Sequence, residues 1–138
     1  MTAVLAVTHR LVVVAPDQGW LTLTEPRSGR AELGNQWIDA TASAARAAGL
    51  PALGRVRIRI EARPDKVAFD GPGIRRAEDV RPTVHRVGEG LEEAGVLAEW
   101  NPAAVRQVLG EELILGTPTG PAGGRGYLII TFTEVDRG

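Results

Sequence analysis

Four residues that can bind metal or transfer protons recur at helical spacing in the middle of the chain. Glu78, His85, Glu89 and Glu92 are separated by seven, four and three positions. If this segment is helical, about 100° of rotation per residue places all four within about 60° of one face. Carboxylate oxygens on one face are the ligands that Mg²⁺ requires. A solvated helix face with acids near its N-terminus has the same spacing, and the spacing alone favours that interpretation.

Arginines form a second pattern that could carry chemistry. Arg55, Arg57 and Arg59 alternate with Val56, Ile58 and Ile60, which places three guanidinium groups on one face of a strand. Such a ladder could follow a phosphate backbone. It could also be a wet sheet face balanced by acids on a neighbouring strand, the simpler reading. Further arginines in the adjoining segments strengthen the phosphate hypothesis: Arg63, Arg75, Arg76, Arg81 and Arg86.

Other reactive motifs are absent or weak. The chain has no cysteine, which excludes a disulfide framework and a thiolate site. The glycine-rich stretch 120–126 opens no predicted helix and has no Gly-Lys-Ser/Thr ending, so it is not expected to cradle phosphate. Aromatic residues make up only 4% of the chain, which makes a base-stacking platform improbable.

Two elements must position the acids and the arginines. The alternation over 55–62 predicts a strand with one apolar face. A helix is predicted over roughly 80–94, with Asp79 as a plausible cap and Pro82 in its first turn. Gly95 is expected to end this helix.

The remaining segments complete a mixed order of strands and helices. We expect a buried strand over 10–15, a helix from Asn35 to about Ala48, and a final strand over 127–135. A strand over 103–115 is predicted to be interrupted near Gly110, and residues 116–126 read as a Gly/Pro loop. The order predicts an α+β fold: a small mixed β-sheet with two main helices packed on it.

Length and composition indicate one ordinary domain. The chain has 138 residues, of which 43% are hydrophobic and 24% charged. A single domain over 1–138 is expected, with its core at about 10–135. No apolar run is long enough to span a membrane and no signal peptide is evident, so a cytoplasmic location is the simplest expectation. The net charge of −1 conceals nine basic and six acidic residues within 50–91.

The order of several short segments resembles the RusA family of Holliday junction resolvases. Trp20-Leu21-Thr22-Leu23 precedes an arginine-containing loop, and a Trp37-led helix ends in Ala-Ala-Gly-Leu-Pro before an Arg-Val-Arg-Ile strand. Pro82-Thr83-Val84 then precedes Glu89-Gly90-Leu91 and Ala94-Gly95-Val96-Leu97, the most specific part. The resemblance covers roughly residues 10–135, particularly as in actinobacterial and phage-type members.

The resemblance implies a small Mg²⁺-dependent (or Mn²⁺-dependent) endodeoxyribonuclease that acts as a homodimer on branched DNA in recombination and repair. In such a site a metal activates water and offsets charge on the leaving oxygen. Carried over by position, the family's carboxylates fall on Glu78, Glu89 and Glu99, its asparagine falls on Asp79 and its helix lysine on His85. These five form the implied catalytic set, and Glu78, Asp79, Glu89 and Glu99 the implied metal ligands.

The implied DNA contacts are the arginines of the loop, the strand and the helix region. They are Arg27, Arg30, Arg55, Arg57, Arg59, Arg75, Arg76 and Arg86.

Besides the changed residue types at Glu78, Asp79, His85 and Glu89, the chain departs from the family pattern at two further places. Arg76 stands where the first aspartate belongs, and Glu99-Trp100 replaces a pair of aspartates. Arginine repels a cation and does not deprotonate. A catalytically inactive RusA-fold homodimer that binds DNA or a protein partner is therefore the alternative. A small-molecule binder with a chance match is the third hypothesis.

Overall fold

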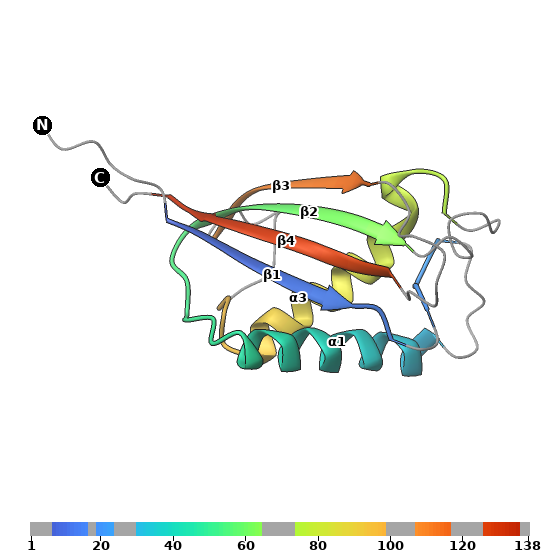
Figure 1. The fold of residues 1–138 in the computed structure, drawn as a ribbon, viewed down its shortest axis with the longest axis horizontal. Helices are drawn as coiled ribbons and strands as arrows, with labels where there is room; N and C mark the ends of the chain where they lie inside the picture. The colour runs from blue at the N-terminus through green and yellow to red at the C-terminus, as the bar shows by residue number, and fades with distance from the viewer. Residues whose placement is uncertain are drawn as a thin grey trace, which may run out of the picture.

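The computed structural model describes residues 7–16, 19–23, 30–64, 74–98, 107–116 and 126–135, and shows a four-stranded sheet with two α-helices (Figure 1). In chain order the elements are β1 (Thr8–Val14), α1 (Arg30–Ala47), β2 (Val56–Pro64), the 3₁₀ helix η1 (Ala77–Val80), α3 (Arg81–Glu93), β3 (Val108–Leu115) and β4 (Gly126–Glu134). The predicted α+β fold with a small mixed sheet and two packed helices is confirmed.

The sheet has the strand order β1-β4-β2-β3. β4 pairs antiparallel with both β1 and β2, whereas β2 pairs parallel with β3. Parallel neighbours need a crossover connection, and α3 lies between β2 and β3 in the chain. Both helices lie on the same side of the sheet (Figure 1), which leaves the other side without a helix among the described residues.

Alternation along the strands builds the core. Val56, Ile58 and Ile60 of β2 are buried, as are Ile130 and Phe132 of β4 beside them. Burying these β-branched and aromatic side chains under the helices removes apolar area from water, which stabilises the fold.

The two helices approach each other closely at a glycine. A Cβ atom added at Gly90 of α3 would lie 2.6 Å from the Ile38 carbonyl oxygen and 2.7 Å from the Thr41 Cβ of α1. Glycine is therefore required for this distance between the helix backbones. The close contact fixes the position of α3, the helix that carries His85, Glu89 and Glu92.

Several sequence predictions need correction. α1 begins at Arg30, not at Asn35, because Leu33 is buried in the core one turn before Trp37 and holds the earlier turn in the helix. The predicted cap of the later helix is also wrong: Val80 is the N-cap of α3, and Asp79 lies within η1.

The strand predictions differ in detail. The sequence predicts β1 as a buried strand, yet Val12 and Val14 are 46% and 57% exposed because the sheet is covered on one side only. The interruption near Gly110 is an irregularity of register: Val56 pairs with Val108, but Arg57 pairs with Gly110. Much of the predicted strand before residue 107 and most of the loop at 116–126 lie outside the described residues.

Among the described residues, neither helix has the length and apolarity needed to cross a membrane.

Candidate functional site

Two of the predicted acidic residues form ion pairs with arginines of the same helical region. Glu78 Oε1 lies 2.8 Å from Arg81 Nη2, and Glu89 Oε2 lies 3.0 Å from Arg86 Nη1. The hydrogen bond from Arg81, followed by its charge, lowers the pKa of Glu78. In both pairs the partners are three residues apart on an exposed surface, where solvent screens the attraction and an ion pair adds little stability.

Asp79 has a structural role at the start of η1. Its Oδ2 accepts hydrogen bonds from the backbone N–H groups of Arg75 (2.8 Å) and Arg76 (2.9 Å). These bonds lower the pKa of Asp79 because they favour the charged carboxylate. Arg76, which stands at the family's first aspartate position, also approaches Asp79 Oδ1 at 3.8 Å through its guanidinium.

Arg81 connects α3 to the sheet. Besides Glu78, it pairs with Glu111 of β3, whose side chain is only 9% exposed. Glu111 belongs to none of the motifs that the sequence indicates. The alternation of Glu111 with Leu113 and Leu115 is the signal that places it on the helix-facing side of β3.

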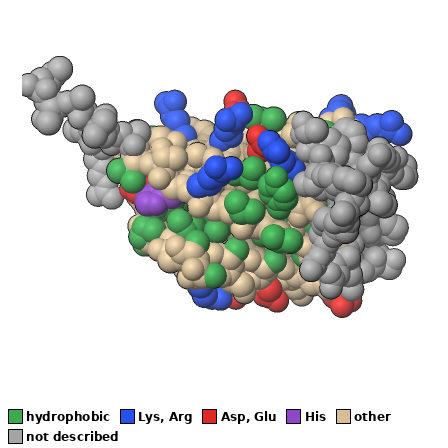
Figure 2. All heavy atoms as spheres, viewed as in Figure 1, with side chains coloured by type: hydrophobic (Ala, Val, Ile, Leu, Met, Phe, Trp, Pro, Cys, Tyr) green, Lys and Arg blue, Asp and Glu red, His purple; other side chains and the backbone are tan. Residues whose placement is uncertain are grey.

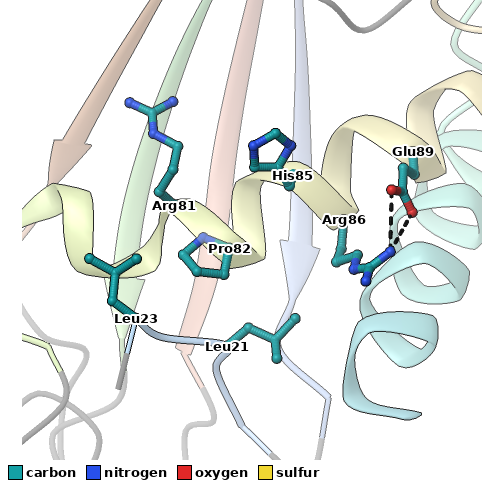
Figure 3. A pocket seen from close by; sticks show the side chains of 7 residues that line it. All are labelled: Leu21, Leu23, Arg81, Pro82, His85, Arg86 and Glu89. Atoms are coloured by element: carbon teal, nitrogen blue, oxygen red, sulfur yellow. Dashed lines mark hydrogen bonds and ion pairs between the residues drawn. The ribbon is translucent and has the colours of Figure 1, made fainter. Parts of the chain in front are cut away.

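A pocket of about 600 Å³ lies between α3 and the segment 19–23 (Figure 3). Its lining residues are Leu21, Leu23, Arg81, Pro82, His85, Arg86 and Glu89. Thr83 holds the segment against α3, because its hydroxyl donates to the Leu21 carbonyl (2.7 Å) and accepts from the Leu21 N–H (2.9 Å).

Arg86 is positioned at the edge of this pocket by a small residue of α1. A Cβ atom at Gly34 would lie 2.8 Å from Arg86 Nε, so the glycine makes room for the arginine. The ion pair with Glu89, drawn as dashed lines in Figure 3, holds the other side of the guanidinium. His85 lies exposed on α3 between Arg81 and Arg86 in the same view.

The structure brings together part of the implied catalytic set. His85 and Glu89 line this pocket. Glu78 does not line it but forms an ion pair with Arg81, which does. Glu99 lies outside the described residues. Within the described ranges, no group of three or more acidic or histidine side chains is arranged to hold a metal ion. The described acids therefore fit arginine partners and backbone amides better than a divalent cation.

The arginine ladder lies on the open face of the sheet, by which we mean the side of the strands not covered by α1 and α3. Arg57 and Arg59 of β2 are exposed there, and Arg55 is exposed just before the strand. Arg59 Nε lies 3.2 Å from Glu112 Oε1, a pair in which both side chains are more than half exposed. Arg57 has no ion pair among the described residues.

The remaining arginines of the predicted DNA-binding set are dispersed. Arg75 and Arg76 are exposed beside η1, and Arg86 lies at the pocket. Arg27 lies outside the described residues, and the structure describes only the backbone of Arg30. The set thus divides between the open face and the α3 side.

One basic residue on the open face was missed from the sequence. Arg10 of β1 pairs across the sheet with Thr131 of β4, which in turn pairs with Arg59 of β2. Arg10, Val12 and Val14 are alternate residues of one strand, and alternate residues share a face of the sheet. The interpretation of 10–15 as a fully buried strand left this signal unused.

Basic and hydrophobic side chains lie next to each other on the side of the molecule seen in Figure 2, over the strands of Figure 1. Two shallow grooves run over the open face. One, of about 380 Å³, is lined by Thr8, Arg10, Arg59, Glu61, Arg63, Ile129 and Thr131. The other, of about 310 Å³, includes Arg57, Arg59, Glu112, Thr131 and Thr133.

No family model matches this chain, and comparison with curated proteins finds no match.

Proposed function

We propose that this chain is a RusA-like protein that binds branched DNA, such as a Holliday junction, in recombination and repair. The observation that supports it best is the arrangement of the open face. The strands place four arginines (Arg10, Arg57, Arg59 and Arg63) and two glutamates (Glu61 and Glu112) there, a net formal charge of +2 on a chain of net charge −1.

Threonine hydroxyls make this charge suitable for phosphate. Thr131 and Thr133 of β4 lie in the rows that also hold Arg59 and Arg57. Neighbouring strand backbones are about 4.8 Å apart, and the residues that carry guanidinium and hydroxyl donors alternate across them in these rows. Phosphate oxygens accept hydrogen bonds from both kinds of donor, and arginine can bind them in a bidentate manner.

The binding proposal is tested with a labelled four-way junction. We expect the native chain to bind it, and the double variant Arg57→Gln/Arg59→Gln to bind at least about tenfold more weakly, since two phosphate contacts are lost. Arg46→Gln, at the exposed end of α1, is the matched control and should bind as the native chain does. Failure of the native chain to bind any DNA would refute the proposal.

Metal-dependent cleavage of the same DNA is the second candidate function. The observation in its favour is that the ion pairs of Glu78 and Glu89 are exposed and weak, so that a divalent cation can compete with arginine for these carboxylates. A dimeric enzyme that cuts branched DNA in Mg²⁺ or Mn²⁺ is what the resemblance implies. The described acids do not supply a complete metal site, and for that reason binding without cleavage ranks first.

Two measurements distinguish the candidates: cleavage of the junction, and calorimetry of Mn²⁺ binding. An endonuclease nicks a four-way junction only when Mg²⁺ or Mn²⁺ is present, and Glu89→Gln abolishes the cut. A protein that only binds leaves the junction intact at high protein concentration and gives no Mn²⁺ signal in calorimetry.

A further inference from the structure

The open face is divided into a basic half and an apolar half. Rows formed by paired residues run across the strands: Thr8, Thr133 and Arg57 form one row, and Arg10, Thr131 and Arg59 the next. Farther along the strands, β1 and β4 carry apolar side chains on this face. Val12 lies beside Ile129, and Val14 lies beside Tyr127.

The apolar half is exposed to an unusual degree. Val12 and Val14 are two of the four large hydrophobic residues that are exposed in the described part of the chain. Ile129 and Tyr127 are partly exposed next to them. Contiguous apolar surface beside polar groups marks a binding site more often than isolated exposed residues do.

An ion pair at this end of the face neutralises the charges that lie beside the apolar side chains. Arg63 is paired with Glu61, and the same arginine interacts more weakly with Tyr127. In the part of the chain that the structure describes, the positive charge of this face that has no ion pair therefore lies in the other half, on Arg10 and Arg57. A ligand that matches both halves must carry its negative charges on one side and flat apolar groups on the other.

We propose that the open face binds a single-stranded segment of DNA. Its phosphates lie against Arg10, Arg57, Arg59 and the threonines, and its bases lie on Val12, Val14, Tyr127 and Ile129. This inference rests on the proposed binding of branched DNA and names the part of that DNA which this face takes.

The division of the face into a basic and an apolar half favours a single strand over a duplex. A duplex presents phosphates outward and keeps the faces of its bases stacked inside, so it would leave the apolar half uncovered. In a single strand the faces of the bases are free, and they can cover apolar side chains while the phosphates meet the basic half. The low aromatic content does not conflict with this arrangement, because aliphatic side chains and one tyrosine form the surface.

The test measures the binding of three fluorescent DNAs by anisotropy: an oligothymidylate of about 15 nucleotides, a duplex of the same length and a four-way junction. We expect the native chain to bind the single strand more tightly than the duplex. Val12→Ser/Val14→Ser should weaken binding of the single strand by about tenfold and that of the duplex by less than about twofold. Arg10→Gln should weaken binding of the single strand and reduce its salt dependence by about 0.7 in the log–log slope.

Leu23→Ser is the matched control, because it also replaces an exposed apolar side chain but lies at the α3 pocket. It should leave single-strand binding unchanged. The substitutions at Val12, Val14 and Arg10 are at exposed positions, and a thermal melt checks that each variant is folded.

Each contrary result has a distinct meaning. If the junction binds but the oligothymidylate does not, this inference is overturned and the proposed function stands. If no DNA binds, both fail. If Val12→Ser/Val14→Ser converts a dimer into a monomer in light scattering and leaves single-strand binding intact, a second copy of the chain covers the face and the inference is overturned.

Discussion

At the scale of single residues, the described acids that the sequence suggests as metal ligands already have hydrogen-bonding partners in the protein. Glu78 and Glu89 each have an arginine partner three residues away, and Asp79 accepts two backbone N–H groups. Identical side chains can either bind a cation or pair with a neighbouring arginine, and their spacing in the sequence is the same in both cases. The residues nearby decide between the two, and here those residues include Arg76, Arg81 and Arg86.

The lowered pKa of Asp79 predicts a pH dependence of stability. In the unfolded chain the ordinary pKa is 3.8, and the two backbone hydrogen bonds lower it in the folded protein. The stabilising contribution is therefore complete above the unfolded-state value and is lost as the pH falls through the lower folded-state value. We expect the free energy of unfolding to depend less on pH below about 4 in Asp79→Asn than in the native chain.

Urea unfolding from pH 2 to pH 7 measures this difference. Glu93→Gln, at the exposed last position of α3, serves as a control for the removal of a carboxylate. Identical pH profiles for Asp79→Asn and the native chain would contradict the prediction.

The pair of Arg81 with Glu111 predicts a larger effect than any exposed ion pair. Because the Glu111 side chain is 9% exposed, Arg81→Met leaves a nearly buried carboxylate without its cation. We expect a loss of about 2–3 kcal/mol in the free energy of unfolding, below the value for a fully buried pair because Arg81 is one-third exposed.

Arg59→Met is the matched comparison, since it breaks the exposed pair with Glu112. It should cost less than about 1 kcal/mol. Equal losses in the two variants would show that burial of Glu111 does not set the energy of its pair.

At the scale of elements, two glycines of the α1–α3 contact differ in what opposes them. Gly90 faces backbone and the branched Thr41, whereas Gly34 faces the flexible side chain of Arg86. Gly90→Ala should destabilise the protein by about 1–3 kcal/mol, because the helices must separate. Gly34→Ala should be within about 1 kcal/mol of neutral, because Arg86 can move and alanine favours the helix.

Thermal or urea unfolding of the two variants checks this prediction. A stabilised Gly90→Ala variant would mean that the helices adjust their spacing without cost.

Much of the element order was predictable from the sequence, because periodicity is a local property. The alternation of Arg55 to Ile60 and the Pro82 and Gly95 boundaries predicted β2 and α3 closely. The start of α1 was not predictable, because the burial of Leu33 depends on the assembled core. The pairing of Glu111 with Arg81 also joins two elements that are 30 residues apart, and no local pattern reports such a contact.

At the scale of the whole molecule, the division of charge matters more than its total. The chain has a net charge of −1, yet the open face is basic. We expect binding of branched DNA to weaken as salt rises, and each arginine removed from the open face should reduce the log–log slope by about 1. Titrations of the native chain and Arg57→Gln between 50 and about 200 mM salt measure it; equal slopes would place Arg57 away from the phosphates.

The place of β4 in the sheet has a consequence for biosynthesis. β4 follows every other described element in the chain, yet it lies between β1 and β2 and supplies the only pairing of β1 within the described sheet. During translation, the backbone N–H and C=O groups of β1 therefore cannot pair with β4 until β4 has left the ribosome. Until then the nascent chain exposes the apolar sides of β1 and β2, and chaperones that shield such segments are expected to engage it at this stage.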